Sequence, residues 1–190
     1  MASLALTVDD GPDPDWTPRL LDVLAGARAR ATFFPIAGRA AAQPQLIARM
    51  IDEGHGIGLH CDAHIRHSVR SRTWLRQETV RALTVLASVG ARPSLWRTPW
   101  GDVAPWTPSV ARANSLRIVH WTIDTHDWRG DSAAEMLQAT DEQLLDGAIV
   151  LAHDGIGPGA RRGDARETVA YAALVADRAH RAGISLEALR

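Results

Sequence analysis

The chain has 190 residues, with 21 Lys plus Arg against 22 Asp plus Glu and a formal net charge of −1. This balance gives no electrostatic basis for binding nucleic acid or an anionic membrane surface, so we expect neither partner. One cysteine excludes an intrachain disulfide, and no apolar run approaches the ~20 residues of a membrane span. The length suits one domain over residues 1–190 with a full core.

The first residues enter a strand-like run without the basic, apolar and cleavage-site segments of a signal peptide. We therefore expect a cytoplasmic protein, although a secreted protein without its leader would look the same.

Short apolar runs rich in strand-forming residues alternate with stretches of helical spacing along the chain. Strands are predicted at 4–8, 31–36, 56–59, 94–97, 117–124, 148–152 and 184–186. Helices are predicted at 19–27, 44–51, 74–89, after Pro108, at 133–145 and at 168–182. Ser132 and Glu135 have the spacing of a capping box at the start of the helix at 133–145.

This alternation predicts an α/β fold in which a parallel sheet is covered by helices on the outside. Seven or eight strand–helix repeats within one domain favour a closed (β/α) barrel over an open sheet. We find no linker, low-complexity segment or sequence repeat that would divide the chain.

Polar residues that suit catalysis follow the carboxyl ends of the predicted strands. In a parallel barrel these ends share one rim, and active sites of this architecture lie there. Surface polar residues without a function would have no reason to follow this rule at five successive strands. The residues concerned are Asp9, Asp10, His60, Arg97, Asp124, Asp127 and His153.

Two histidines, His60 and His64, are four residues apart directly after a predicted strand. On a helical turn, positions i and i+4 share a face, so both imidazoles can bind one divalent cation. Asp9 and Asp10 are the obvious source of an oxygen ligand. Two histidines and one carboxylate leave coordination positions open, as in a catalytic metal site. Such a histidine pair alone also occurs by chance on protein surfaces, and only its combination with the carboxylates favours the metal.

Five short motifs resemble, in order, those of the polysaccharide deacetylases, which are also called NodB-homology proteins or carbohydrate esterase family 4. They are TVDDGP at 7–12, HCDAH at 60–64, RTPWG at 97–101, DTHDW at 124–128 and VLAH at 150–153. The resemblance implies a distorted NodB-like (β/α) barrel with about seven parallel strands. It also implies an enzyme that hydrolyses the N-acetyl group of an amino sugar with the help of a metal.

The resemblance assigns the metal ligands and the two proton-transfer groups. Asp10, His60 and His64 would bind one divalent ion, with zinc favoured and cobalt or another divalent ion as the alternative. Asp9 would be the general base, since a cation lowers the pKa of water enough for a carboxylate to take its proton. His153 would be the general acid that protonates the leaving amine.

The remaining assignments concern orientation and substrate binding. By resemblance, Arg97 would orient Asp9 and keep it ionised, and Asp127 would raise the pKa of His153. The backbone N–H of Trp100 would form part of an oxyanion hole. The side chains of Trp128 and Leu151 would enclose the acetyl methyl group.

Short loops between the motifs favour a soluble oligosaccharide, of chitooligosaccharide or peptidoglycan type, or a small N-acylated molecule. The alternatives are a deacylase of a small N-acyl or N-formyl metabolite in specialised biosynthesis, an O-acetyl esterase, and a non-catalytic carbohydrate-binding relative. The acid–base types at Asp9 and His153 argue against the last.

Three further features of the sequence bear on the site. Cys61 stands where the family usually has Ser or Thr, so a weaker donor replaces a hydroxyl beside the metal ligands. The Gly-rich segment 155–163 is predicted as a mobile loop beside the site, and Arg161 and Arg162 as solvated surface or loop residues.

Overall fold

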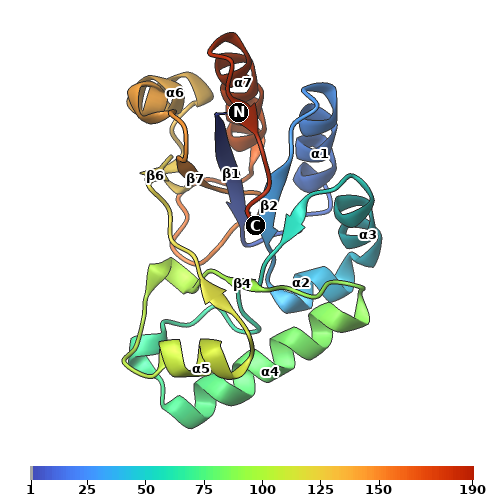
Figure 1. Ribbon diagram of the computed structural model, residues 1–190, viewed down its shortest axis with the longest axis vertical. Helices are drawn as coiled ribbons and strands as arrows, with labels where there is room; N and C mark the ends of the chain where they lie inside the picture. The colour runs from blue at the N-terminus through green and yellow to red at the C-terminus, as the bar shows by residue number, and fades with distance from the viewer. Residues whose placement is uncertain (1) are drawn as a thin grey trace.

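Strand β1 (Ser3–Asp9) lies in the middle of the main sheet of the computed structural model, which describes residues 2–190. It pairs in parallel with β2 (Ala31–Phe34) on one edge and with β7 (Ile149–His153) on the other. The sheet continues to β3 (Gly56–Ile57) beyond β2 and to β6 (Ile123–Asp124) beyond β7. Figure 1 shows β1 flanked by β2 and β7.

A second, two-stranded parallel sheet extends the curve of the first. It consists of β4 (Leu95–Trp96) and β5 (Arg117–Ile118). Leu59, two residues after β3, joins the two sheets through a parallel bridge to Trp96. The backbone N–H of Leu59 donates to the carbonyl of Leu95 over 2.8 Å. The predicted parallel barrel is therefore confirmed, with its strands distributed over two sheets.

The single strand predicted at 117–124 is wrong: the segment forms β5 and β6, which belong to different sheets. The backbone N–H of Val119 still donates to Trp96 of β4, whereas that of Thr122 donates to Ile149 of β7. The chain changes partners between these residues, and no strand pairing joins β5 to β6 within residues 2–190. Strand β8 (Ser185–Leu186) pairs with the first residues of β1.

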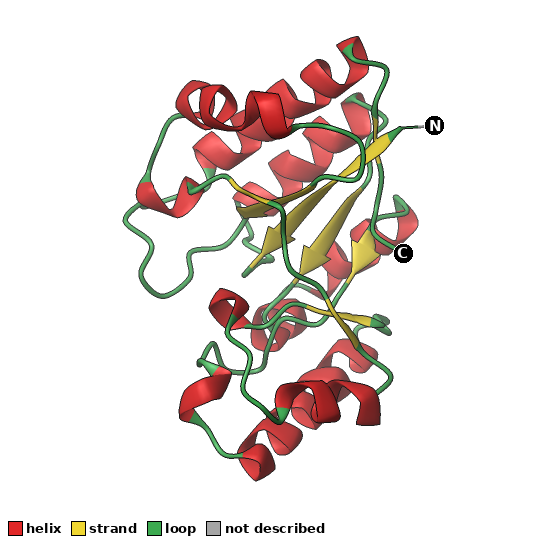
Figure 2. Ribbon diagram, turned by 60° about the vertical axis from the view of Figure 1, so that its left-hand side comes forward, coloured by secondary structure: helices red, strands yellow, loops and turns green. Residues whose placement is uncertain are grey.

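The helices lie outside the strands, as Figures 1 and 2 show. They are α1 (Trp16–Gly26), α2 (Ala37–Ala42), α3 (Pro44–Asp52), α4 (Arg72–Ser88), α5 (Thr107–Ala113), α6 (Ala133–Thr140) and α7 (Arg166–Arg181). Short 3₁₀ turns lie at His67–Val69, Pro99–Gly101, Asp127–Arg129 and Asp141–Gln143. Helix α7 packs beside α1 and α6, and α4 packs against α2 and α5. In residues 2–190, every helix is too short or too polar to cross a bilayer.

Two helix predictions need correction. Helix α2 was not predicted, and it begins at Ala37, directly after the strand that was predicted at 31–36. Helix α6 ends at Thr140 rather than at residue 145, where the chain tightens into a 3₁₀ turn. This turn brings Leu144 into the core, with 1% of its surface exposed.

The two faces of β1 bury different kinds of side chain, apolar on one face and polar on the other. Leu4, Leu6 and Val8 of β1 belong to the large apolar cluster that the helices cover. Successive strand residues point to opposite faces, so Thr7 and Asp9 point the other way, towards the inside of the barrel.

A small apolar cluster lies on the inner face of the strands. It contains Phe34, Leu95 and Val119, with Ile149 and Leu189 packed against it. Adjacent residues of β2 separate the two clusters, since Phe33 belongs to the outer one. The barrel interior is therefore filled by side chains: this small apolar cluster and polar residues such as Thr7 and Asp9.

The capping box of α6 generates a stability prediction. Ser132 Oγ accepts from the backbone N–H of Glu135, and the Ser132 N–H donates to the Glu135 carboxylate over 2.8 Å. We expect Ser132→Ala to lower the free energy of unfolding by about 1 kcal/mol, measured by urea denaturation. The matched control is Ser88→Ala, whose hydroxyl bonds Val85 in the last turn of α4 and which should change stability little. Equal effects of the two substitutions would contradict this account of the cap.

Candidate active site

Two adjacent carboxylates mark the carboxyl end of β1. Asp9 is the last strand residue, and Asp10 adopts a left-handed conformation with φ of 74°. Each residue is only 3% exposed. Because the chain turns between them, the two carboxylates face different partners: Asp9 contacts Arg97, and Asp10 contacts His60 and His64.

Asp10, His60 and His64 form a three-residue group that fits a metal ion. Asp10 Oδ1 lies 3.3 Å from Nε2 of each histidine, and the three ligand atoms lie within 4.8 Å of one another. Asp10 Oδ1 is buried and has no hydrogen-bond partner. Burial alone would raise the pKa of Asp10, but the close contacts with His60 and His64 and the positive charge nearby lower it well below its usual value. An ionised carboxylate oxygen without a donor, facing two ring nitrogens, suits a cation.

A hydrogen bond to the backbone of Arg97 fixes the ring orientation of His60. Its Nδ1 lies 2.7 Å from the carbonyl oxygen of Arg97, so the N–H at Nδ1 donates to that carbonyl. This bond leaves the lone pair of Nε2 directed towards Asp10 and His64, as in metal sites whose histidines are held by backbone carbonyls.

The predicted helical turn at 60–64 is wrong. Cys61 forms a parallel bridge with Ile36, and the chain bends at residues 62 and 63. The backbone N–H groups of Asp62 and Ala63 donate to the carboxylate of Glu78, not to carbonyls along a helix. The two imidazoles still converge, because a bend after a strand brings His64 back towards His60.

Arg97 lies inside the barrel and is completely buried. Its Nη1 donates to Asp9 Oδ1 over 3.1 Å and to Thr7 Oγ1 over 2.6 Å. The guanidinium carbon lies 4.4 Å from the centre of the Phe34 ring. The guanidinium thereby compensates the charge of Asp9 and fixes the direction of its carboxylate.

His153, the last residue of β7, forms an ion pair with Asp127, which begins the 3₁₀ turn after β6. His153 Nδ1 lies 2.7 Å from Asp127 Oδ1, and the backbone N–H of His153 donates to Asp127 Oδ2 over 2.8 Å. Burial lowers the pKa of His153, but the charge and hydrogen bond of Asp127 outweigh it and raise this pKa to about 9. Since Asp127 holds Nδ1, the other ring nitrogen, Nε2, is free to face substrate.

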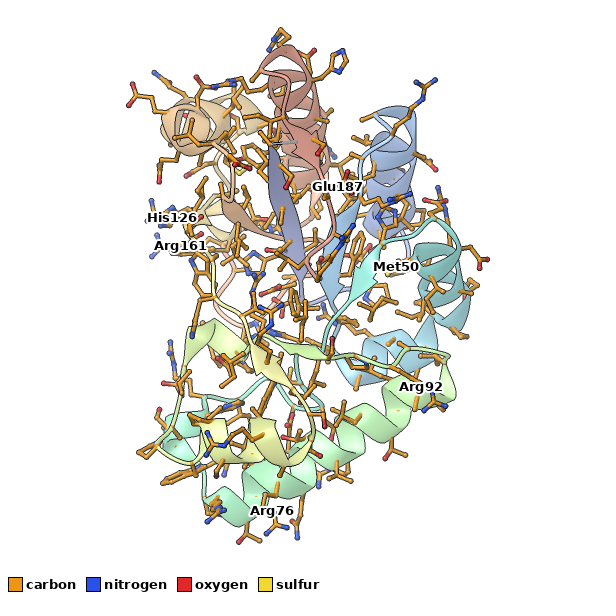
Figure 3. The ribbon with its side chains drawn as sticks, viewed as in Figure 1. Met50, Arg76, Arg92, His126, Arg161 and Glu187 are labelled. Carbon is orange, nitrogen blue, oxygen red and sulfur yellow. The ribbon has the colours of Figure 1, made fainter. Side chains whose placement is uncertain are left out.

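Arg162 lies in a loop, which is one of the two predictions made for it, but its side chain is part of this cluster and not solvated surface. Its Nη1 lies 3.0 Å from Asp127 Oδ2, and its side chain is 6% exposed. Its Nη2 donates to the carbonyl of His153 over 2.6 Å. The neighbouring Arg161 is exposed as predicted, and Figure 3 shows it with His126 at the edge of the molecule. The sequence offered no local signal, because the partner of Arg162 lies 35 positions earlier in the chain.

One cavity of about 380 Å³ joins these groups. Its walls include the two carboxylates and the histidines His60, His64 and His153, together with Trp100, Trp128 and Leu151 as predicted. Arg66 and Trp121 also line it and were not predicted. Trp121 lies between β5 and β6, at a strand end that the merged strand prediction concealed.

The Gly-rich loop forms one wall of the cavity, and its first residues lie against the carboxylate turn. Arg39 connects it to the carboxylate turn, since Nη1 donates to the Asp10 carbonyl and Nη2 to that of Ile156, over 2.9 and 2.8 Å. At Gly157, a Cβ would overlap the Asp10 carboxylate. The absence of a side chain at Gly157 therefore lets the loop close against a candidate metal ligand.

Trp100 lies beside the metal-ligand group. Its ring meets that of His64 edge-on at 4.1 Å, and its backbone has φ of 55°. The guanidinium of Arg66 lies 4.7 Å from the centre of the Trp100 ring. Eight of the ten predicted site residues thus line the cavity, and the other two, Arg97 and Asp127, contact Asp9 and His153. Their chemical roles stay predictions.

Comparisons with known proteins agree with the resemblance found in the motifs. The family model described as polysaccharide deacetylase matches residues 2–119. A chitooligosaccharide deacetylase of Bradyrhizobium sp. (strain ANU 289) is 38% identical over 165 residues, which cover 84% of this chain and 74% of that protein. A peptidoglycan-N-acetylglucosamine deacetylase of Bacillus cereus is 32% identical, over 82% of this chain and 57% of that protein. The solved structure of a family 4 carbohydrate esterase from Streptomyces lividans in complex with acetate matches with a TM-score of 0.87 and 27% identity, covering 97% of this chain and 91% of that one.

The ion pair of His153 predicts its titration. In metal-free protein, we expect the imidazole to lose its proton with a pKa of about 9, followed by NMR. Asp127→Asn removes the carboxylate but leaves the burial, so the pKa should fall towards the ordinary value of 6.5 or below it. Asp164→Asn, at an exposed carboxylate, serves as the control and should leave the titration unchanged. An unshifted His153 titration in Asp127→Asn would contradict the assigned pairing.

The close approach of the Gly-rich loop predicts a loss of metal affinity. Gly157→Ala should displace Asp10 and weaken zinc binding by about tenfold or more, measured by competition with a chromogenic chelator. Gly163→Ala is the matched control in the same loop, since a Cβ there has no atom within 4 Å. Unchanged zinc affinity in Gly157→Ala would show that the loop does not constrain the ligand.

Proposed function

This chain belongs to the polysaccharide deacetylase family, and we propose that it removes the N-acetyl group from N-acetylglucosamine units of a soluble oligosaccharide. One observation carries the proposal: the Asp10–His60–His64 group, Asp9 and His153 line the same cavity. The names of the two relatives, which act on chitooligosaccharide and on peptidoglycan, support this class of substrate.

We propose that Asp10, His60 and His64 hold one zinc ion, because a carboxylate and two imidazoles suit zinc. Cobalt or another divalent ion is the alternative. When bound, the cation acts as a Lewis acid that polarises the acetyl carbonyl and lowers the pKa of water. The orphaned Oδ1 of Asp10 and the directed Nε2 of His60 support this assignment.

Asp9 acts as the general base in this proposal. It accepts a proton from the water molecule that attacks the carbonyl carbon of the acetyl group. The contact with Arg97 Nη1 keeps the carboxylate in one orientation, so its other oxygen remains available to the water. The attack produces a tetrahedral carbon with a negatively charged oxygen, and the backbone N–H of Trp100 is our candidate donor to that oxygen.

His153 acts as the general acid. Nε2 donates its proton to the sugar nitrogen, the C–N bond breaks, and acetate and a free amine result. An amide nitrogen leaves poorly without a proton, so this step requires a protonated imidazole at neutral pH. The ion pair with Asp127, which raises the pKa of His153 to about 9, supports that role.

The shape of the cavity supports a sugar substrate. Its volume of about 380 Å³ lies at the lower end of the ~300–1,000 Å³ typical of ligand pockets. Trp128 and Leu151 offer an apolar wall for the acetyl methyl group, and Trp121 offers a flat face for a sugar ring. Such a cavity accommodates one sugar unit and leaves its neighbours in the oligosaccharide outside.

The proposal predicts metal-dependent release of acetate from N-acetylglucosamine oligomers. Metal-stripped protein should be inactive, and zinc should restore the reaction. Asp9→Asn should lower kcat by about 10²–10⁴ with zinc still bound, because it removes the base and leaves the ligands intact. Asp52→Asn, at an exposed position of α3, is the control and should retain full activity.

Each contrary result points to a different conclusion. Acetate release only from O-acetyl esters would make the protein an esterase. Zinc bound without any release from oligomers would favour a small N-acyl substrate. No divalent metal ion bound to the wild-type protein, whether zinc, cobalt or another, would contradict the proposed function itself.

A further inference from the structure

Glu78 is a buried acid outside the proposed catalytic machinery. It lies on α4 and is 1% exposed, on the face of the helix that packs inwards. Arg76, two residues earlier, is exposed, and Figure 3 shows it at the outer edge of the molecule. Burying a carboxylate costs free energy unless hydrogen bonds or positive charge compensate it, so its partners indicate what it does.

The partners of Glu78 are two consecutive backbone groups between the metal-ligand histidines. Glu78 Oε1 accepts from the N–H of Asp62 over 2.5 Å and from the N–H of Ala63 over 3.2 Å. Its other oxygen, Oε2, is buried without a hydrogen-bond partner. Within residues 2–190, the hydrogen bonds of this carboxylate therefore go only to the bend that joins His60 to His64.

This bend needs an acceptor from elsewhere in the fold. Residues 60–64 form no helical turn, so the N–H groups of residues 62 and 63 have no carbonyl one turn back. A buried backbone N–H without a partner is costly, and a carboxylate is a strong acceptor for two of them. The neighbouring side chain, Cys61, is buried and offers only a weakly accepting sulfur.

We propose that Glu78 is a positioning residue for the metal site: it holds the backbone of residues 62 and 63 in the bend that brings His60 Nε2 and His64 Nε2 to Asp10 Oδ1. The inference rests on the metal site of the proposed function and adds a residue that acts through the loop. Its carboxylate fixes the spacing of the two histidines, just as the Arg97 carbonyl fixes the ring of His60.

Arg81 provides an internal comparison on the same helix. Its Nε lies 3.1 Å from Asp62 Oδ2, so it also joins α4 to the bend, but its side chain is 51% exposed. An exposed ion pair of this kind contributes little, whereas the buried Glu78 carboxylate accepts from two backbone N–H groups of the bend. Substitution of Arg81 therefore removes a contact with this bend and should leave the zinc affinity unchanged.

The experiment compares two replacements of Glu78 that have the same length. Glu78→Gln retains an acceptor oxygen, Glu78→Met removes it while filling the space, and Arg81→Ala is the control. For each full-length variant, zinc affinity is measured by competition with a chromogenic chelator, and Tm is measured without metal. Wild-type protein is measured first, because failure of the wild type to bind zinc would overturn the metal site itself.

We expect Glu78→Met to weaken zinc binding by about 10–100-fold, the range for groups that orient metal ligands. Glu78→Gln should lose much less affinity, and Arg81→Ala should match the wild type. A purely structural role would lower the Tm of Glu78→Met and leave its zinc affinity unchanged, and that result would overturn the proposal. Equal losses in Glu78→Met and Arg81→Ala would also overturn it.

A second variant covers the case in which Glu78→Met does not fold. Glu78→Asp keeps the negative charge but withdraws the acceptor by one methylene group, so it should weaken zinc binding more than Glu78→Gln does. Wild-type zinc affinity in a folded Glu78→Asp protein would overturn the proposal.

Discussion

The site is organised around one carboxylate oxygen that has no hydrogen-bond donor. Asp10 Oδ1 is buried and faces Nε2 of His60 and of His64, both at 3.3 Å. A cation among these three groups would compensate the buried carboxylate and would use the lone pairs of both ring nitrogens. The surrounding contacts serve this arrangement: the Arg97 carbonyl orients His60, Glu78 holds the bend before His64, and Gly157 leaves room beside Asp10.

Two separate ion pairs flank the candidate metal group, one at the proposed base Asp9 and one at the proposed acid His153. Arg97 contacts Asp9 inside the barrel, and Asp127 contacts His153 at the rim. Arg162 compensates the charge of Asp127, so this carboxylate can remain ionised. The ionised Asp127 in turn raises the pKa of His153 to about 9. Pairs of titratable groups whose surroundings separate their protonation states are what acid–base catalysis at neutral pH requires.

The sequence predicted what depends on short-range pattern. The strand that ends at Asp9–Asp10, the capping box at Ser132 and the gathering of polar residues on one rim all follow from periodicity and strand ends. The errors arose where residues distant in the sequence determine the local structure. The segment 117–124 forms two strands because its hydrogen-bond partner changes from β4 to β7. Likewise, only the folded chain brings Arg162 to Asp127, and only α4 explains why residues 60–64 bend instead of forming a helical turn.

The central claim is that one cation is shared by Asp10, His60 and His64. Its most direct test is a crystal structure of zinc-loaded protein, with diffraction data collected on both sides of the zinc absorption edge. We predict a single anomalous peak within about 2.0–2.2 Å of Asp10 Oδ1 and of Nε2 of His60 and His64. A zinc-loaded crystal without a peak there, or with zinc bound by other residues, would contradict the account.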